Sequence, residues 1–331
     1  MRVCRDRRFH TCCILVLLAG ASPATSGARE IFVNNVAGDD RYEGSAPQAS
    51  NVGGGPLRTI AHALRLAKPG DRIILANTPE PYRESITLEG FRHSGSAEKP
   101  LAIIGNGAVV DGSAPVPDEV WEHYQGNVFR FAPRRSSHVQ LFHENRPLTR
   151  VPIPDGSLRV PKLEPLQWCL FGREVYFRVD AKQDDQQRNK LPQNYHLTHT
   201  GLPVGVTLYD VRNVMIADLI VQGFQLDGVN AHDKAFNVQL VGVVCRGNGR
   251  SGVTVAGSSQ VEIVEATIGD NGPSQILCEG YSHTAISNSH VFANTGPSVQ
   301  RETSAEVLIE GLTLGGLLLD EDISPAPPAA P

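Results

Sequence analysis

Two glutamates 23 residues apart are the side chains whose spacing best suits chemistry. Glu279 follows the apolar segment SQILC, and Glu302 follows SVQR. If the chain forms coils of 23 residues, the two side chains stack one strand spacing, about 4.8 Å, apart. Carboxyl groups about 5–5.5 Å apart act as acid and nucleophile in retaining glycosidases. We therefore predict that Glu279 and Glu302 are the catalytic pair of a glycoside hydrolase.

Neighbouring charged residues would complete such a site. Counted back along the same column across one inserted residue, His232 or Asp233 falls two coils earlier, with Ala256 between. Arg301 would neutralise part of the acidic charge or contact a carboxylate on a sugar. The alternative interpretation is that outward glutamates at corners are only solvated, because a chain with 35 acidic residues contains some such pairs by chance.

A second acidic column has a longer spacing. Asp218 and Glu265 occupy equivalent positions with Gly242 between them, so they lie two coils, roughly 9.6 Å, apart. That distance is nearer to the separation in inverting glycosidases. Asp227 is interpreted as a turn residue and Asp270 as a corner residue. Few Lys or Arg residues occur here, so a base for an elimination reaction has few candidates.

These positions depend on a repeat of 23 residues. Five segments align, and they begin at residues 213, 237, 260, 283 and 306. Their apolar residues alternate, which is the period of a strand and not of a helix. One apolar column contains Ile216, Leu240, Ile263, Ile286 and Ile309. Another contains Val221, Cys245, Ile268, Val291 and Leu314.

Strands of this kind bury their apolar face only when coils stack on one another. We therefore predict a solenoid in which the column from Ile216 to Ile309 is buried. Asn248, Asn271 and Asn294 are also 23 residues apart. Asn tolerates corner conformations and its amides can hydrogen-bond along the stack, so these residues are predicted to form a structural ladder.

The repeat resembles the pectate-lyase-like superfamily of secreted right-handed parallel β-helix proteins. The N-terminal segments IFVNNVAGDDRYEGSA, GPLRTIAHALRLAKPGDRIIL and PYRESITL carry the same resemblance. It implies an all-β fold, a right-handed parallel β-helix (solenoid) with an N-terminal capping helix. Ile60, Ala63, Leu64 and Ala67 give that helix one apolar face. It also implies activity on an extracellular polysaccharide, with a hydrolase favoured over a lyase.

Residues 113–200 interrupt the repeat with the strand-like segments VFRF, VQLF, RPLTRVP and EVYFRV. This stretch resembles a small β-rich insertion found in some β-helix glycoside hydrolases and polysaccharide lyases. Trp168, Phe171 and Tyr176 would form a sugar-binding face, because aromatic rings pack on pyranose faces. The alternative is that they pack the insertion itself. In an enzyme, the insertion is expected to fold back over the glutamate pair.

The N-terminus has the features of a secretory signal peptide over residues 1–28. Four arginines precede the apolar run Cys12–Ala21, which is too short to span a membrane. We expect secretion to an extracellular or periplasmic location. Cleavage would change the net charge from −5 to −8. Further divisions are expected at 29–112 (cap and first coils), 113–200 (insertion), 201–316 (coils) and 317–331 (a disordered Pro-rich tail).

Charge and cysteine content limit the partners. An acidic chain without basic runs is poorly suited to nucleic acid or an anionic membrane surface, so a polysaccharide is the expected partner of a monomeric protein. Cys169, Cys245 and Cys278 remain after cleavage, lack metal-ligand spacing and are expected to be buried thiols.

No metal or other cofactor is predicted, although the acidic turn with Asp39, Asp40 and Glu43 leaves calcium as an open alternative. The rival function is non-catalytic: a glycan-binding or cell-surface structural β-helix. Only five 23-residue units follow the insertion, whereas related enzymes usually have more coils and a C-terminal cap. This shortage of coils favours the rival, while the aromatic insertion favours the enzyme.

Overall fold

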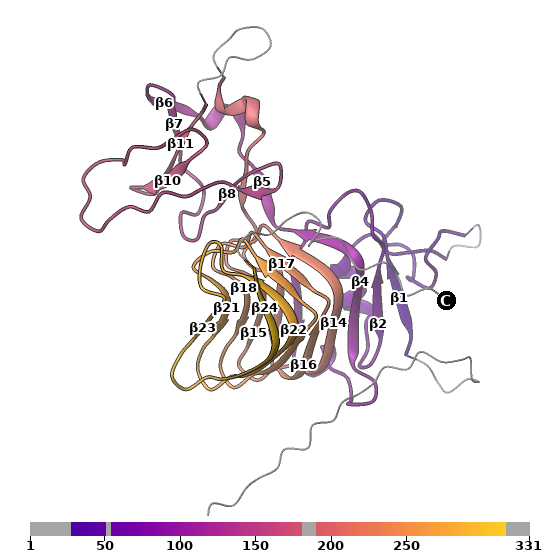
Figure 1. Cartoon of the computed structure of the whole chain (residues 1–331). Helices are drawn as coiled ribbons and strands as arrows, with labels where there is room; N and C mark the ends of the chain where they lie inside the picture. Colours follow the sequence, from indigo (N-terminus) through magenta and orange to yellow (C-terminus); the bar gives the residue numbers. More distant parts are fainter. Residues whose placement is uncertain (1–27, 51–53, 181–189, 316–331) are drawn as a thin grey trace, which may run out of the picture.

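The computed structural model describes residues 28–50, 54–180 and 190–315, and its main body is a stack of parallel coils (Figure 1). The larger sheet has ten strands: β1 (Glu30–Val33), β2 (Arg72–Leu75), β4 (Leu101–Asp111), β14 (Arg212–Gln222), β16 (Phe236–Val241), β17 (Val244–Arg246), β19 (Gln260–Val264), β20 (Thr267–Gly269), β22 (His283–Phe292) and β24 (Glu306–Gly315). The second sheet has six: β3 (Ile86–Glu89), β13 (Val206–Tyr209), β15 (Asp227–His232), β18 (Ser251–Val255), β21 (Ser274–Cys278) and β23 (Val299–Arg301).

Neighbouring strands in both sheets pair in parallel, coil upon coil. The predicted right-handed parallel β-helix is confirmed. The helical elements are short: α1 (Ile60–Leu66) and the 3-10 helices η1 (Phe91–His93), η2 (Asp118–Val120) and η3 (Pro192–Tyr195).

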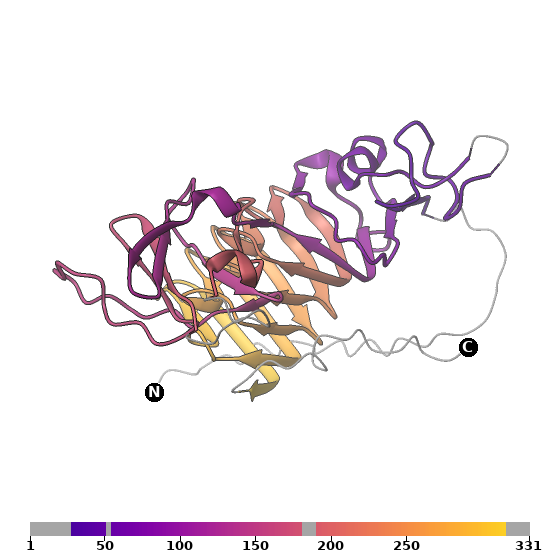
Figure 2. The ribbon, with the colours of Figure 1, turned by 90° about the horizontal axis from the view of Figure 1, so that it is seen from above.

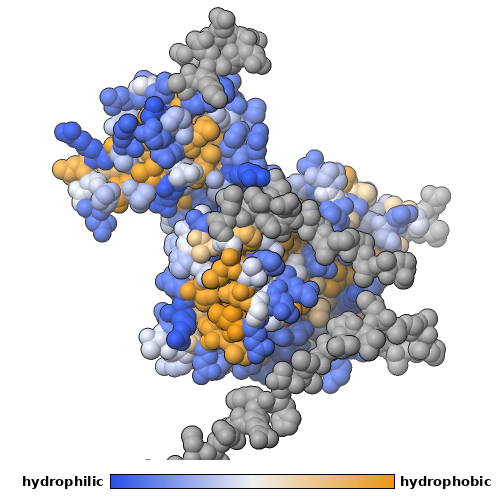
Figure 3. Space-filling view, in the orientation of Figure 1, coloured by the Kyte–Doolittle hydropathy of each residue, from blue (hydrophilic) through white to orange (hydrophobic). Residues whose placement is uncertain are grey.

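The predicted apolar columns form the core. Ile216, Leu240, Ile263 and Ile286 lie in register on successive strands, and each is at most 1% exposed. Ile309 continues the register on β24 but is 45% exposed, because no described strand covers that end of the stack. Figure 3 shows the resulting apolar surface. The column is therefore confirmed in register, and the prediction of burial is wrong for Ile309.

The Asp218–Glu265 column has a backbone role. Asp218, Gly242 and Glu265 all have positive φ values, of 50°, 61° and 54°, where each coil bends between two strand segments. Gly and Asp accept this conformation more readily than most residue types, so Gly242 and Asp218 suit the bend, and Glu265 adopts it as well. The spacing that suggested inverting chemistry is explained by this repeated corner.

The asparagine ladder is built from two of its three predicted members. Asn248 and Asn271 are fully buried, and the Asn248 amide donates to Asn271 Oδ1 at 3.0 Å. The third, Asn294, is half-buried and instead donates to Asp270 Oδ1 at 2.6 Å. Gln275 Oε1 takes its place by accepting a hydrogen bond from Asn271 at 2.9 Å. The ladder prediction is therefore wrong for Asn294.

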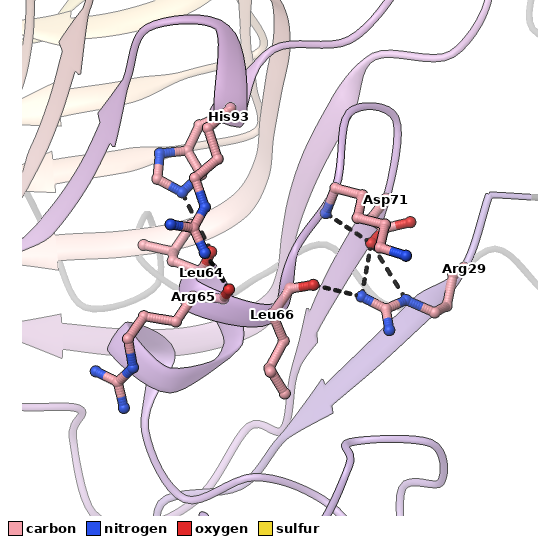
Figure 4. A network of polar contacts seen from close by, with 8 residues as sticks. Arg29, Leu64, Arg65, Leu66, Asp71 and His93 are labelled. Carbon is pink, nitrogen blue, oxygen red and sulfur yellow. Dashed lines mark hydrogen bonds and ion pairs between the residues drawn. The ribbon is translucent and has the colours of Figure 1, made fainter.

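The capping helix α1 is held by side chains that bind its C-terminal carbonyls. Arg29 donates to the Leu66 carbonyl at 2.6 Å and to Asp71 at 2.8 Å (Figure 4). His93 Nε2 donates to the Leu64 carbonyl at 3.2 Å. The last carbonyls of a helix lack partners within the helix, so these donors satisfy groups that would otherwise be orphaned.

The acidic turn serves this same cap. Asp40 accepts hydrogen bonds from the Arg58 amide at 2.9 Å and the Thr59 hydroxyl at 2.8 Å, and Asp39 pairs with Arg41. These contacts favour a structural role for the turn. In the described part of the chain, no group of three or more His, Cys, Asp or Glu side chains is arranged to hold a metal ion.

The insertion, hereafter the insert, forms two small antiparallel sheets beside the coils (Figures 1 and 2). Their strands are β5 (Ser113–Pro115), β6 (Glu122–Gln125), β7 (Val128–Phe131), β8 (Leu141–His143), β9 (Arg146–Pro147), β10 (Trp168–Phe171), β11 (Glu174–Arg178) and β12 (Thr198–Thr200). The insert has its own apolar core, so it is a module and not an enlarged coil.

The predicted signal peptide (1–28) lies, except for its last residue, outside the described residues, as does the whole of the predicted tail (317–331) together with Gly316 of the predicted coils. None of the helices in the described ranges is long and apolar enough to cross a membrane. Cys169, Cys245 and Cys278 are buried free thiols, as predicted. Burial raises the pKa of Cys169 to about 11 and that of Cys245 to about 12.

Candidate functional site

The two glutamates of the predicted pair are stacked, and one of them is exposed. Cys278 pairs with Arg301 across β21 and β23, so Glu279 and Glu302, which follow them, lie side by side. Glu279 is half-buried and Glu302 is exposed. The Glu302 carboxylate accepts a hydrogen bond from the Gly280 amide at 2.8 Å. This contact ties the turn after β21 to the next coil, which is a structural use of Glu302.

The other predicted members of that site surround the same corner. His232 belongs to the column, and its ring centroid lies 5.0 Å from that of Tyr209. Asp233 sits at the adjacent corner position with a φ of 63°, 3.9 Å from His232 Nδ1. Arg301 donates to the Ala305 carbonyl at 3.1 Å. These residues stabilise turns, and none of these contacts converges on a cavity.

The insert docks away from the glutamate pair. Its Gln140 side chain donates to the Asn248 carbonyl at 2.9 Å, and Gln225 donates to the Ser137 carbonyl of the insert at 2.9 Å. Strand β21 runs away from this corner, so Glu279 lies roughly 16 Å beyond its start. The contacts of the insert with Asn248 and Gln225 lie at this corner, so the predicted overhang of an insert aromatic over the glutamate pair has no support from them.

The predicted sugar-stacking aromatics belong to the packing of the insert. Trp168 is 1% exposed, with its indole N–H donating to the Leu148 carbonyl at 2.9 Å and the Arg150 guanidinium over its ring. Tyr176 is 4% exposed, and half-buried Phe171 packs near it with a 6.3 Å centroid distance. The stacking prediction is therefore wrong for Trp168 and Tyr176, because a module of this size needs large side chains for its own core.

An open groove with a volume of about 1030 Å³ runs between the insert and the first coils. Arg83 and Asp111 line its coil side, and Arg134, Arg135 and His199 line its insert side. We call this space the insert groove. The residues that line it are up to 120 positions apart in the sequence, and it has the concave walls that the glutamate pair lacks.

Asp111 anchors the coil side of the insert groove. It is 3% exposed and accepts hydrogen bonds from the Ser113 amide at 2.7 Å and from Gln222 Nε2 at 3.2 Å. Gln222 in turn accepts from Arg246 Nε at 2.8 Å, and Arg83 lies 3.7 Å from the Asp111 carboxylate. The buried carboxylate is therefore compensated by charge and hydrogen bonds, as a buried charge must be.

Asp270 lies further along the same corner, in a narrow cleft that is continuous with Asp111. Burial raises the pKa of its carboxyl, against the lowering effects of the Asn294 hydrogen bond and of Arg246. Register places Asp270 next to Gly269, three coils or roughly 14 Å from Asp111. This exceeds the 6.5–9.5 Å separation of inverting glycosidases. The two acids therefore do not form a hydrolytic pair.

His199 is the one side chain of the insert groove with the character of a base. Burial lowers its pKa, so the ring is neutral near pH 7. Its Nδ1 lies 2.8 Å from the Thr200 carbonyl, which can only accept a hydrogen bond. The proton of the neutral ring is therefore on Nδ1, and Nε2 carries a free lone pair.

Substituting Gly249 by Ala is expected to disturb the docking of the insert. A Cβ atom at this position would lie 1.9 Å from the His138 carbonyl oxygen and 2.3 Å from that of Gln225. Such overlap requires backbone movement, with a cost of about 1–3 kcal/mol. We expect a lower urea midpoint and faster proteolysis of the insert. Gly54→Ala is the control, because its Cβ would approach no atom closer than 3.4 Å. Equal midpoints for both variants would refute the docking geometry.

The insert is also expected to make stability pH-dependent. Burial lowers the pKa of His199, and burial together with Arg250 lowers that of His138, from a usual value of 6.5. The unfolded chain then binds more protons than the folded chain below about pH 6.5, so stability falls as the pH falls. Thermal unfolding at pH 7.5 and 5.5 should show this loss. A double variant, His138→Gln with His199→Gln, should lose less stability over that interval, and an identical loss would contradict the prediction.

One protein family and several solved structures are similar to this chain. The family described as "Right handed beta helix region" matches residues 198–314. No curated protein matches the chain. Similar solved structures include XylC in complex with xylose (11% identity, 84% of this chain and 68% of that chain, TM-score 0.42). They also include a GH136 lacto-N-biosidase from Eubacterium ramulus (12%, 82% and 43%, TM-score 0.45) and pectate lyase Pel9A (12%, 81% and 54%, TM-score 0.37).

This chain spans about half, or less, of the last two proteins. At such identities the likeness concerns the fold alone. The coil register and the family match across residues 198–314 together show that this part of the chain is a right-handed parallel β-helix region.

Proposed function

We propose that this protein is secreted and recognises an extracellular polysaccharide in the insert groove. The observation that supports this most directly is that two chemically different walls line one open groove of about 1030 Å³. Arginine donors and the Asp111 carboxylate line it beside the exposed apolar surfaces of Pro117 and Val120. Sugars present hydroxyl groups around apolar C–H faces, so a binding site for them needs both kinds of surface.

Recognition is better supported than glycoside hydrolysis. Two carboxyl groups must flank the scissile bond in the usual hydrolytic mechanisms. Among the described residues that line the insert groove, Asp111 is the single carboxylate. Glu279 and Glu302 have the required stacking, but they lie outside this groove. The hydrolase prediction therefore has no support from the groove, and the secretion and monomeric state of the protein remain proposals from the sequence.

A second candidate function follows from His199. A neutral imidazole with a free Nε2 lone pair can abstract a proton from a bound sugar, which is the first step of an elimination reaction. Its position in the wall of the insert groove favours this chemistry over hydrolysis. Under this alternative the protein is a polysaccharide lyase, and His199→Gln would abolish turnover while leaving glycan binding in place.

The test is a binding and activity screen of the full chain against plant and algal polysaccharides. Assays for reducing ends and for unsaturated products separate hydrolysis, elimination and binding alone. Ala132→Trp should abolish binding, because exposed Ala132 lines the insert groove and the indole would fill it. Leu158→Trp is the control, since Leu158 is 91% exposed elsewhere in the insert.

The predicted glutamate pair has its own test in the same screen. Glu279→Gln combined with Glu302→Gln is expected to leave binding and turnover unchanged. Loss of activity in this double variant, with full activity in Ala132→Trp, would overturn the proposed site and restore the pair as the catalytic centre.

A further inference from the structure

We infer that the insert carries a second binding site, a small pocket that takes one neutral sugar residue. The pocket has a volume of about 210 Å³ and shares no lining residue with the insert groove, so the inference goes beyond the proposed function. It is smaller than the roughly 300–1,000 Å³ of pockets for drug-sized ligands. It therefore has room for a single ring and not for a stretch of polysaccharide chain.

Two turns of the insert meet at this pocket. Glu144 and Asn145 form the two-residue loop between β8 and β9, where His143 pairs with Arg146. His196 ends the 3-10 helix η3. Side chains from both turns line the pocket, so segments far apart in the sequence converge on it.

The backbone of these turns favours glycine, yet larger side chains are present. The φ angle is 51° at Glu144, 59° at Asn145 and 45° at His196, all in the left-handed region. Two-residue hairpin loops of this kind prefer Asn-Gly, Asp-Gly or Gly-Gly, and a left-handed residue that ends a helix is usually Gly. Asn and His tolerate the region better than Glu. Unfavourable backbone conformations cluster at ligand sites, so their convergence on one pocket points to a use for these side chains.

The lining side chains have polar atoms left for a ligand. His143 Nδ1 donates to the Tyr195 carbonyl at 2.8 Å, which leaves Nε2 for another partner. The distance from this Nε2 to Glu144 Oε1 is 4.0 Å, too long for a hydrogen bond. The side chains of Asn145 and His196 make no hydrogen bond or ion pair with the rest of the described chain.

This set of groups suits hydroxyl groups, each of which both donates and accepts a hydrogen bond. The Glu144 carboxylate accepts, and the Asn145 amide and the Thr198 hydroxyl can do both. Among the described residues that line the pocket there is no Lys or Arg, so an anionic ligand would meet Glu144 without compensation. The lining residues also lack the arrangement of three or more ligands that a metal ion needs. A neutral polyhydroxylated ring is therefore the ligand that fits.

The experiment uses neutral monosaccharides as probes. Ligand-observed NMR of the full chain would test glucose, galactose, xylose, rhamnose and N-acetylglucosamine. We expect at least one of them to bind with a Kd on the order of 1 mM, because one ring makes few contacts. Ala132→Trp, which fills the insert groove, should leave this binding unchanged.

Glycine variants assign the binding to the pocket. Glu144→Gly and His196→Gly should each weaken binding of that monosaccharide roughly tenfold. Both should stay folded, because glycine suits the left-handed backbone of the two turns. Arg173→Gly is the matched control, since Arg173 is exposed elsewhere in the insert and has a φ of 74°. This control should bind the sugar as the unmodified chain does, and the urea midpoints of all three variants check that they are folded.

Several outcomes would overturn the inference. One is that no monosaccharide of the panel binds. Another is equal weakening in Arg173→Gly, and a third is loss of binding in Ala132→Trp, which would move the sugar into the insert groove. Binding of Zn²⁺ alone, lost in His196→Gly and without any sugar binding, would assign the pocket to a metal ion. The polysaccharide screen of the insert groove is a separate measurement, so failure here leaves the proposed function in place.

Discussion

Replacing Asp227 by Ala is expected to lower the free energy of unfolding by about 3–5 kcal/mol. Asp227 has no exposed surface and forms a bidentate ion pair with Arg250, at 2.9 and 2.6 Å. Its carboxylate also accepts hydrogen bonds from the Ser251 hydroxyl at 2.9 Å and the Thr254 hydroxyl at 3.0 Å. Removing the carboxylate would leave the half-buried Arg250 guanidinium and the Asn230 amide without this acceptor, and the Ser251 and Thr254 hydroxyls with only each other, which is why the cost is large.

Urea unfolding at pH 7 measures this cost. Glu30→Ala is the matched control, because the Glu30–Arg72 ion pair is about 40–45% exposed on both sides and such pairs are worth about 0–1 kcal/mol. Asp227→Asn should fall between the two, since it keeps the shape and some acceptors but loses the charge. A cost for Asp227→Ala as small as that of the control would show that Arg250 finds water or another acceptor.

Replacing Ile263 by Ala is expected to cost about 2–5 kcal/mol. Ile263 is fully buried, with Leu240 and Ile286 directly above and below it in the same column. A solenoid core is held by backbone hydrogen bonds at a fixed strand spacing, so neighbouring coils cannot close on the cavity.

Ile309→Ala is the control for this substitution. Ile309 is also an isoleucine of this column, but it is 45% exposed at the end of the stack. Its truncation therefore loses less transfer free energy and leaves a smaller cavity. The difference in urea midpoint between the two variants measures the effect of position alone. Equal costs would mean that the open end of the coils is covered in solution.

The sequence by itself determined the coils. Alternation and a 23-residue step specify both which side chains point inward and which residues stack, because a slip of one residue would turn every inward side chain outward. The register from Ile216 to Ile309 followed from that rule, and the apolar face of the capping helix followed from the helical spacing of Ile60, Ala63 and Leu64. The burial of Ile309 did not, because burial depends on the presence of a next coil and not on the residue itself.

Local sequence patterns gave incomplete predictions for side chains whose partners lie in a distant segment of the chain. Asp227 was interpreted as a turn residue from its neighbours, yet its partners are Arg250, Ser251 and Thr254 of the next coil. The stacking of Glu279 and Glu302 was predicted correctly. The spacing of residues along the chain does not show, however, which corner of the coils the insert covers.

Tertiary structure alone decided where the insert docks, and therefore where the groove is. Arg134-Arg135 is the only Arg-Arg pair after residue 8, a signal visible in the sequence. The sequence does not show that this pair lines a groove opposite Arg83. That arrangement depends on the docking of the insert at the Gly249 backbone. An insert has no period to fix its register against the coils, so its position is set by contacts between segments far apart in the chain.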